Sequence, residues 1–309
     1  MLELKNVRKA YGDKVAVDNL SLDVPKGVIY GIIGPNGAGK TTTIRMIMNI
    51  TVPDSGEVLL DGQRVTSDFR NRVGYLPEER GLYKKMTLEE VIVYMGELKG
   101  RTRRELIAKI DPWLQRMNLA EYRLKKVEEL SKGMQQKLQF VTTIIHGPDL
   151  IILDEIFSGL DPLNIELIKD IILDLKREGK TILFSTHVME QAEKLCDHVC
   201  MINRGQKVID GRLNEVKAGF GKNSVQIDIE GDGGFIAELE GVGGVTEFNN
   251  YIELNLEEKA DTNCILKAIA DRVLVRRFDI VEPSLYNIFI DTARIDPAEL
   301  NNKGGTTDV

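Results

Sequence analysis

Cysteine, histidine and tryptophan are scarce in this sequence. Its 309 residues include three cysteines, three histidines and one tryptophan. Cys196 and Cys200 flank His198 in the stretch CDHVC, but this spacing is not a zinc-ligand pattern and Cys264 stands alone. So few cysteines exclude a disulfide-stapled scaffold. We therefore expect three buried, reduced thiols and no structural metal.

Long apolar runs and an excess of positive charge are also missing. The longest apolar runs, at 28–34 and 150–153, fall far short of the roughly 20 residues that a membrane helix needs. The opening stretch MLELKNVRKAYG has no apolar segment of the kind found in signal peptides. Lysine and arginine number 41 against 48 aspartates and glutamates, which gives a net charge of −7. We expect a cytoplasmic protein whose main partner is not nucleic acid.

Strand and helix patterns alternate along much of the chain. Strand patterns occupy residues 2–32, and their last part, VIYGII, is a continuous apolar run typical of a central strand. A helix pattern follows at 41–50. Later, the apolar strands LIILDE (150–155) and TILFST (181–186) are separated by a helix pattern. This order predicts a doubly wound α/β core within a first domain at residues 1–215.

Two segments depart from this alternation. Between about 87 and 130, three amphipathic segments follow one another and predict a helical insert: LEEVIVYMGELKG, RRELIAKIDPWLQRMNL and EYRLKKVEEL. From 222 to 294, the pattern β-α-β-β-α-β predicts a small α+β domain of the ferredoxin-like type, closed by a helix in SLYNIFIDTAR. Residues 295–309 are expected to be disordered.

A glycine-rich loop after the third predicted strand carries the most specific chemical pattern. GPNGAGKTT fits G-x-x-x-x-G-K-[ST] and lies between a predicted strand and a predicted helix. Its glycines let backbone N–H groups wrap phosphates, Lys40 neutralises their charge, and Thr41 offers a hydroxyl to Mg²⁺. The residues predicted to bind the nucleotide here are Gly34, Pro35, Asn36, Gly37, Ala38, Gly39, Lys40, Thr41 and Thr42.

Two acids and a histidine follow later core strands. Asp154 ends the apolar run of LIILDE, where it can hold Mg²⁺, and Glu155 beside it can orient and deprotonate a water. His187 follows TILFST, and parallel strands present their carboxyl ends at one edge of a sheet. A lone histidine is more often structural, but three strand ends at one edge favour function. We predict Glu155 and His187 as the catalytic residues of an ATPase.

A second anion-binding pattern begins at LSKGMQQK. Ser131 and Gly133 place a hydroxyl and bare backbone N–H groups at a helix start, where the macrodipole favours an anion. The alternative is an ordinary N-cap at Ser131. One nucleotide has no need of two separate cradles, and the residues alone leave open which phosphate this second one holds.

The five stretches GPNGAGKT, LSKGMQQK, LIILDE, SGLD and STH, in this order, resemble the nucleotide-binding subunit of ATP-binding cassette (ABC) transporters over about 1–215. The resemblance implies a P-loop ATPase core with an antiparallel β-subdomain and a helical insert, using ATP and Mg²⁺. It implies a homodimer or heterodimer of such subunits, peripheral on the cytoplasmic face of the membrane, with a separate permease. It also implies that Tyr11 stacks on adenine. Contacts to the partner's ATP would come from Ser131, Lys132, Gly133 and Asp161.

Some positions depart from the family pattern. Lys132 and Met134 stand where Gly and Gln are usual, which leaves Ser131 and Gly133 intact. Glu78, in GYLPEERGLY, replaces the glutamine that usually links the nucleotide to the membrane partner. Its carboxylate can accept from water or bind Mg²⁺, but it cannot donate as an amide does. We therefore expect Thr41, Asp154 and Glu78 as metal ligands, and weaker or slower sensing of the γ-phosphate.

The ending EPSLYNIFIDTAR, after a small α/β module, resembles the branch that serves small export permeases, including drug and sodium export. The C-terminal module carries no chemical motif, so dimer stabilisation and ligand sensing both stay open. The rival class is a soluble ABC ATPase acting on ribosomes or DNA. Such proteins typically carry two cassettes, long coiled coils or zinc modules, which this sequence lacks. The cargo is not encoded here, and export rests on the resemblance alone.

Overall fold

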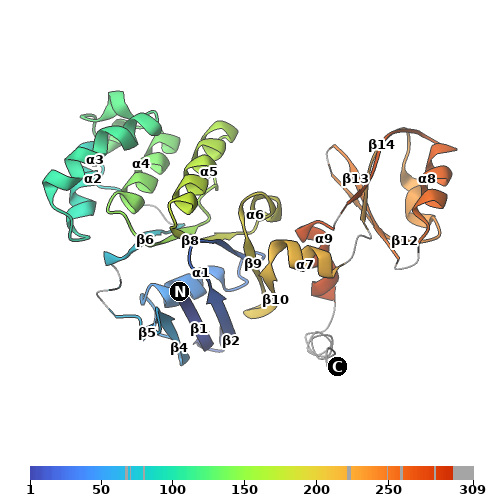
Figure 1. Ribbon diagram of the computed structural model, residues 1–309, viewed down its shortest axis with the longest axis horizontal. Helices are drawn as coiled ribbons and strands as arrows, with labels where there is room; N and C mark the ends of the chain where they lie inside the picture. The colour runs from blue at the N-terminus through green and yellow to red at the C-terminus, as the bar shows by residue number, and fades with distance from the viewer. Residues whose placement is uncertain are drawn as a thin grey trace. The chain divides into compact units, whose positions relative to one another are not determined.

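In the computed structural model the chain divides into two units, Met1–Asp210 and a second that begins at Gly211. The structure describes residues 1–66, 69, 71–78, 81–220, 224–248, 250–257, 260–281 and 283–294. Figure 1 shows the sheets and helices of each unit. Within the described residues, no helix is both long enough and apolar enough to cross a bilayer. The tail predicted to be disordered, 295–309, lies outside the described residues.

The first unit is built on a six-stranded sheet. Its strands, in spatial order, are β10 (Gln206–Arg212), β9 (His198–Asn203), β3 (Ile29–Ile33), β8 (Thr181–Thr186), β7 (Leu150–Asp154) and β6 (Val73–Leu76). Strand β3 pairs in parallel with β8 and β9, and β7 with β6 and β8. Every residue of β3, β7 and β8 is buried, which explains their continuous apolar runs. The loops that follow these three strands leave the sheet at one edge.

Helices and a second sheet cover the two faces of this central sheet. The antiparallel sheet has the order β2 (Lys14–Val24), β1 (Leu2–Tyr11), β4 (Ser55–Leu60) and β5 (Gln63–Arg64). Helix α1 (Lys40–Ile47) contacts both β2 and β7, and its buried residues belong to a core cluster shared with strands of both sheets. Helices α5 (Pro162–Arg177) and α6 (Met189–Leu195) pack on β8. In Figure 1, α4 and α5 are drawn above the sheet and α1 below it.

The helical insert contains two of the three helices predicted for it. Helices α2 (Leu88–Glu97) and α3 (Arg103–Arg116) each begin with a capping box, at Thr87 and Thr102. Helix α2 packs against α3 and against α4 (Lys132–Ile144), so the insert is anchored on the helix that Ser131 caps.

The third predicted helix, in EYRLKKVEEL, was wrong. Only two 3₁₀ turns form there, Ala120–Tyr122 and Val127–Glu129. The backbone between them bonds elsewhere: the N–H of Leu88 donates to Lys125 O, and the N–H of Val127 donates to Met86 O. Tertiary backbone pairing with the start of α2 therefore replaces the intrahelical bonds that the amphipathic pattern predicts.

His146 lies buried just after α4, beside the segment that joins α2 and α3. Its side chain is 1% exposed, neither ring nitrogen has a hydrogen-bond partner among the described residues, and its carbonyl accepts from Arg101 Nε at 2.8 Å. Burial, followed by the charge of Lys99, lowers the pKa of His146 to about 4. The unfolded chain therefore takes up this proton before the folded chain does, and stability falls as the pH drops from about 6.5 to 4.

We expect His146→Leu to remove this acid sensitivity. From pH 7.5 to 4.5, the wild-type free energy of unfolding should fall by about 2–3 kcal/mol more than that of the variant, following the size of the pKa shift. Denaturant titrations of the first unit, followed at both pH values, measure the difference. Parallel pH profiles for the two proteins would contradict the assignment.

The second unit contains a four-stranded antiparallel sheet. Its order is β12 (Val242–Glu247), β13 (Ile252–Leu256), β11 (Ser224–Glu230) and β14 (Leu274–Val281). With a 3₁₀ turn at Gly234–Glu238 and helix α8 (Thr262–Ala270), this gives the predicted β-α-β-β-α-β succession. Alternate residues of β11 and β13, such as Val225, Ile227 and Leu254, form a core with Ile265 and Ile269 of α8. The unit also begins with helix α7 (Leu213–Gly219), which the sequence patterns did not predict.

Helix α9 (Leu285–Arg294) follows the last strand, as predicted. The Ser284 N–H at its start donates to the buried carboxylate of Glu253 on β13 at 3.1 Å, which ties the helix to the sheet. The prediction of buried thiols holds for Cys196 and Cys200 and is wrong for Cys264. Cys264 lies in the first turn of α8, where its Sγ contacts Asp261 Oδ2 at 3.3 Å on the surface.

Candidate functional site

The glycine-rich loop connects β3 to α1 in a conformation that its glycines require. Gly34, Gly37 and Gly39 all have positive φ angles, of 151°, 78° and 110°. A Cβ on Gly34 would lie 2.1 Å from Ile202 O, and one on Gly39 would lie 2.5 Å from Ala16 O. The loop is thus both left-handed and closely packed against its neighbours, conditions that only glycine meets. Its backbone N–H groups and the start of α1 are then available to phosphates.

Lys40, the first residue of α1, is buried inside this loop. Its ammonium donates to the carbonyls of Gly34 at 2.9 Å and Pro35 at 3.2 Å. The same nitrogen lies 3.5 Å from Glu155 Oε1, and both side chains are less than 10% exposed. The positive charge is therefore held at the base of the loop and is already engaged with the predicted catalytic carboxylate.

A cleft of about 360 Å³ opens beside the loop. Its walls come from β1, β2, the glycine-rich loop, α1 and the ends of β6 and β7. The residues that line it are Tyr11, Lys14, Ala16, Asn36, Gly37, Gly39, Lys40, Thr41, Thr42, Glu78 and Glu155. Most residues predicted to bind nucleotide are thus brought together in one place. Tyr11 is 49% exposed at the cleft, so its ring is open to a stacking partner.

Asp154 ends β7 and has no exposed surface. Its Oδ1 accepts from the Ser185 hydroxyl, while its Oδ2 is buried and without a hydrogen-bond partner among the described residues. Burial raises the pKa of Asp154, and the hydroxyls of Ser185 and Thr41 oppose that effect. An unpartnered buried carboxylate oxygen beside a threonine hydroxyl is an oxygen donor set that suits Mg²⁺. The residues present therefore fit Mg²⁺, the metal expected from the sequence.

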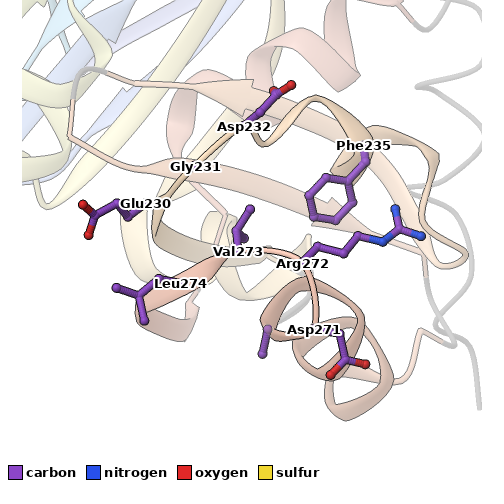
Figure 2. A pocket seen from close by; sticks show the side chains of 9 residues that line it. Glu230, Gly231, Asp232, Phe235, Asp271, Arg272, Val273 and Leu274 are labelled. Carbon is purple, nitrogen blue, oxygen red and sulfur yellow. The ribbon is translucent and has the colours of Figure 1, made fainter.

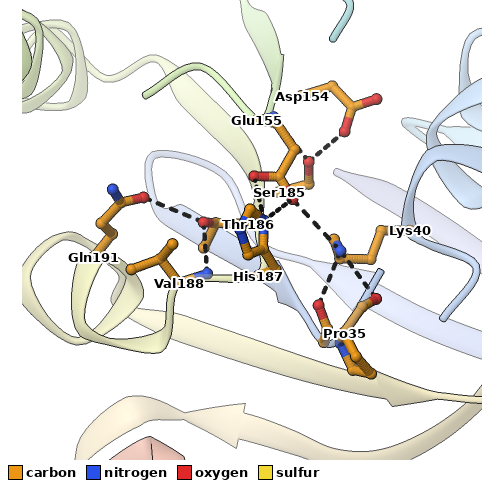
Figure 3. Close-up of polar contacts among 10 residues, drawn as sticks. Pro35, Lys40, Asp154, Glu155, Ser185, Thr186, His187, Val188 and Gln191 are labelled. Carbon is orange, nitrogen blue, oxygen red and sulfur yellow. Dashed lines mark hydrogen bonds and ion pairs between the residues drawn. The ribbon is translucent and has the colours of Figure 1, made fainter. Parts of the chain in front are cut away.

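Glu155 and His187 are in direct contact, as Figure 3 shows. The Nδ1 of His187 lies 3.0 Å from both carboxylate oxygens of Glu155. The backbone of Glu155 is left-handed, with φ 49°, and its N–H donates to the carbonyl of Ser185 at 3.2 Å. This turn directs the carboxylate toward Lys40 and His187, and the two predicted catalytic residues meet at the edge where β7 and β8 end.

The second predicted cradle lies outside the cleft. Ser131 caps α4, and its Oγ accepts from the Met134 N–H at 3.3 Å, so this residue is an N-cap, as the alternative interpretation predicted. Lys132 is exposed beside it. The side-chain amide of Asn164 joins this helix start to Asp161: its Nδ2 would lie 3.6 Å from a Cβ on Gly133 and donates to Asp161 Oδ2 at 2.5 Å. These residues form one surface that shares no lining residue with the cleft.

Three residues near the site were not predicted. Lys14 and Ala16 line the cleft from the start of β2, where a strand pattern gives no indication of ligand contact. Ser185 bonds to Asp154 and to the backbone of Glu155. Its position directly before Thr186 and His187 was the one available sign, because parallel neighbours place it opposite Asp154.

The second unit has a hollow of its own, and none of the predicted site residues lines it. Figure 2 shows it between the turn at Gly231 and the end of α8, lined by Phe235, Arg272 and Val273 among others. The guanidinium of Arg272 lies over the ring of Phe235, with 4.7 Å from its Cζ to the ring centroid. The cation and the aromatic ring thus form a cation–π contact within this hollow.

Comparison with known proteins identifies the family. A family model for the ABC transporter matches residues 17–158, and a model for the C-terminal domain of DrrA1-3-like ATP-binding proteins matches residues 211–293. The uncharacterized ABC transporter ATP-binding protein YhaQ of Bacillus subtilis is 43% identical over 291 residues, covering 94% of this chain and 98% of that protein. The chain belongs to the ABC transporter ATP-binding proteins.

Two further comparisons describe this ABC ATP-binding subunit more closely. The Nod factor export ATP-binding protein I of Cupriavidus metallidurans is 39% identical over 219 residues, covering 70% of this chain and 72% of that protein. The dimeric, post-hydrolysis structure of the ATP-binding cassette MJ0796 bound to ADP and phosphate matches with a TM-score of 0.63 and 25% identity, covering 69% of this chain and 99% of that one. The family and the α/β fold predicted from the motifs are confirmed.

Proposed function

We propose that this ABC ATP-binding subunit hydrolyses ATP to power a membrane exporter of drugs, ions or other small solutes. The observation that carries the proposal is the contact of Glu155 with both Lys40 and His187, at a cleft that Lys40 and Glu155 line. A relative named for Nod factor export supports export over import, as does the resemblance of the ending EPSLYNIFIDTAR to the export branch. The subunit would work peripherally on the cytoplasmic face of the membrane, against a separate permease.

Each residue of the cleft has a distinct role in this proposal. The adenine stacks on Tyr11, the loop N–H groups hold the phosphates, and the ammonium of Lys40 offsets their charge. Glu155 accepts a proton from the attacking water, and His187 orients the Glu155 carboxylate and bonds to an oxygen of the γ-phosphate. When bound, Mg²⁺ neutralises phosphate charge, and Thr41, Asp154 and Glu78 are the residues that would hold it.

Two copies would complete the site. The surface of Ser131, Lys132, Gly133 and Asp161 lies apart from the cleft, so it is free to contact a nucleotide held by another subunit. The Ser131 hydroxyl already accepts the Met134 N–H and keeps its own proton for a phosphate oxygen. In this arrangement, Asn164 lowers the pKa of Asp161 through its N–H and amide, which keeps that carboxylate charged at the seam. The dimer would be built from two copies of this chain or from this chain and a related one.

Glu78 distinguishes this cleft from one with the usual glutamine. It is an exposed carboxylate that lines the cleft with Glu155, and its charge adds to the forces that raise the pKa of Asp154. We expect Glu78→Gln to raise the Mg²⁺ concentration for half-maximal ATPase activity up to about fivefold, the size expected for an exposed charge pair. ATP affinity in EDTA should rise slightly because one repulsive charge is lost. An unchanged Mg²⁺ titration would remove Glu78 from the metal site.

The transport proposal is tested with the chain and its membrane partner together. A tagged copy is purified from detergent-solubilised membranes, and any polytopic protein that copurifies at fixed ratio is reconstituted with it in liposomes. We expect ATPase activity that depends on the reconstituted partner and ATP-driven movement of solute, both abolished by Glu155→Gln. Recovery of the chain with ribosomes or DNA instead, at undiminished ATPase rate, would favour the soluble class.

A further inference from the structure

Ser185 sits at the carboxyl end of β8, directly opposite Asp154 on β7. It has no exposed surface, and Figure 3 shows its side chain between the two acids. Its hydroxyl donates to Asp154 Oδ1, and its Oγ accepts from the Glu155 N–H at 3.2 Å. One hydroxyl thus contacts both neighbouring residues of the acidic pair.

The contact with Asp154 leaves that carboxylate with one committed oxygen and one open oxygen. A serine hydroxyl has a single proton to donate, and Oδ1 receives it. Oδ2 stays buried without a partner among the described residues. Because rotation of the carboxylate would break the bond from Ser185, the open oxygen is held in one direction.

The contact with Glu155 holds an unfavourable backbone conformation. Glu155 is a non-glycine residue with φ 49°, a left-handed conformation that costs free energy unless its surroundings stabilise it. Its N–H is shared between the carbonyl and the hydroxyl of Ser185, each at 3.2 Å. That turn is what places the Glu155 carboxylate beside Lys40 and His187.

We propose that Ser185 is a positioning residue that aims the open oxygen of Asp154 at the metal and holds the turn at Glu155. The inference rests on the proposed ATPase function and deepens it, because it assigns the orientation of both acids to one hydroxyl on the neighbouring strand. The next residue on β8 makes different contacts, since the Thr186 hydroxyl accepts from the Val188 N–H at 3.0 Å and bonds to Gln191 at 3.2 Å. Ser185 therefore serves the metal side of the site, and Thr186 serves the loop that carries His187.

The test compares Ser185→Ala with Ser185→Thr, which restores a hydroxyl in a residue suited to a strand. The full-length variants are loaded with a non-hydrolysable ATP analogue, and Mn²⁺ affinity is measured by electron paramagnetic resonance. We expect Ser185→Ala to weaken Mn²⁺ binding about tenfold, as the loss of a hydrogen bond to a charged group predicts. Ser185→Thr should stay within about twofold of wild type, and analogue affinity in EDTA should be unchanged in both.

Several outcomes would overturn the inference. Wild-type Mn²⁺ affinity in a folded Ser185→Ala protein would exclude a role in aiming Asp154. Equal weakening of analogue binding with and without metal would mean that Ser185 only supports the fold of the cleft. Should Ser185→Ala fail to fold, Ser185→Val, which matches the shape of Ser185→Thr but has no hydroxyl, is measured in its place, and Mn²⁺ affinity equal to that of Ser185→Thr would exclude the role as well. Failure of the wild-type protein to bind analogue or Mn²⁺ would instead refute the proposed ATPase function.

Discussion

Replacing Glu155 with Gln should stop ATP turnover while ATP stays bound. The amide keeps the size of the side chain but cannot accept the proton of the attacking water, and loss of a positioned general base typically lowers kcat by about 10²–10⁴-fold. Glu155 is the carboxylate that contacts His187 at 3.0 Å and Lys40 at 3.5 Å, so the change falls at the centre of the site. Steady-state phosphate release measures the rate.

The same variant should accumulate as an ATP-bound dimer. If two subunits close on two nucleotides and hydrolysis reopens them, blocking hydrolysis leaves the closed state populated. Size-exclusion chromatography with Mg²⁺ and ATP should show a larger species than without nucleotide. The matched control is Glu190→Gln on the exposed face of α6, which should behave as wild type. Fast turnover in the Glu155 variant would take the base role away from this residue.

Replacing Lys40 with Ala should weaken ATP binding strongly. Lys40 is 5% exposed, and its ammonium donates to the carbonyls of Gly34 and Pro35. Removing one partner from a buried, hydrogen-bonded charge pair costs about 2 kcal/mol or more, which is at least about 30-fold in Kd. The variant also loses the contact between Lys40 and Glu155.

Titration with a fluorescent ATP analogue measures this affinity. Lys194→Ala, which removes an exposed lysine that pairs with Glu190 on α6, is the matched control. Circular dichroism checks that both variants are folded, because Lys40 also supports the loop. Undiminished affinity in a folded Lys40→Ala protein would contradict the assignment of the glycine-rich loop as the phosphate cradle.

The sequence predicts the strands and helices of the core well, because local patterns and burial agree there. The buried run at β3 lies inside its sheet, as predicted. Asp154 ends β7 at the edge of the sheet where the glycine-rich loop leaves β3, as parallel strands require. The pattern failed at EYRLKKVEEL, where distant backbone groups of Met86 and Leu88 take the hydrogen bonds. Such competition depends on tertiary neighbours that an amphipathic period does not encode.

The candidate site was predictable where a motif names its residues and less so where packing does. Glycine spacing indicated Lys40 and Thr41, and strand ends indicated Asp154, Glu155 and His187. The contact of Ser185 with two acids depends on the register between β7 and β8, which sequence spacing leaves open. Likewise, the orphaned environment of His146 is set by residues of the insert that fold over it.

The ion pair between Lys40 and Glu155 links the binding of phosphates to the activation of water. The carboxylate proposed to activate water lies 3.5 Å from the ammonium proposed to bind the phosphates. A bound triphosphate would compete with the Glu155 carboxylate for that ammonium and so weaken the ion pair. Binding of the substrate would then itself free the general base for catalysis.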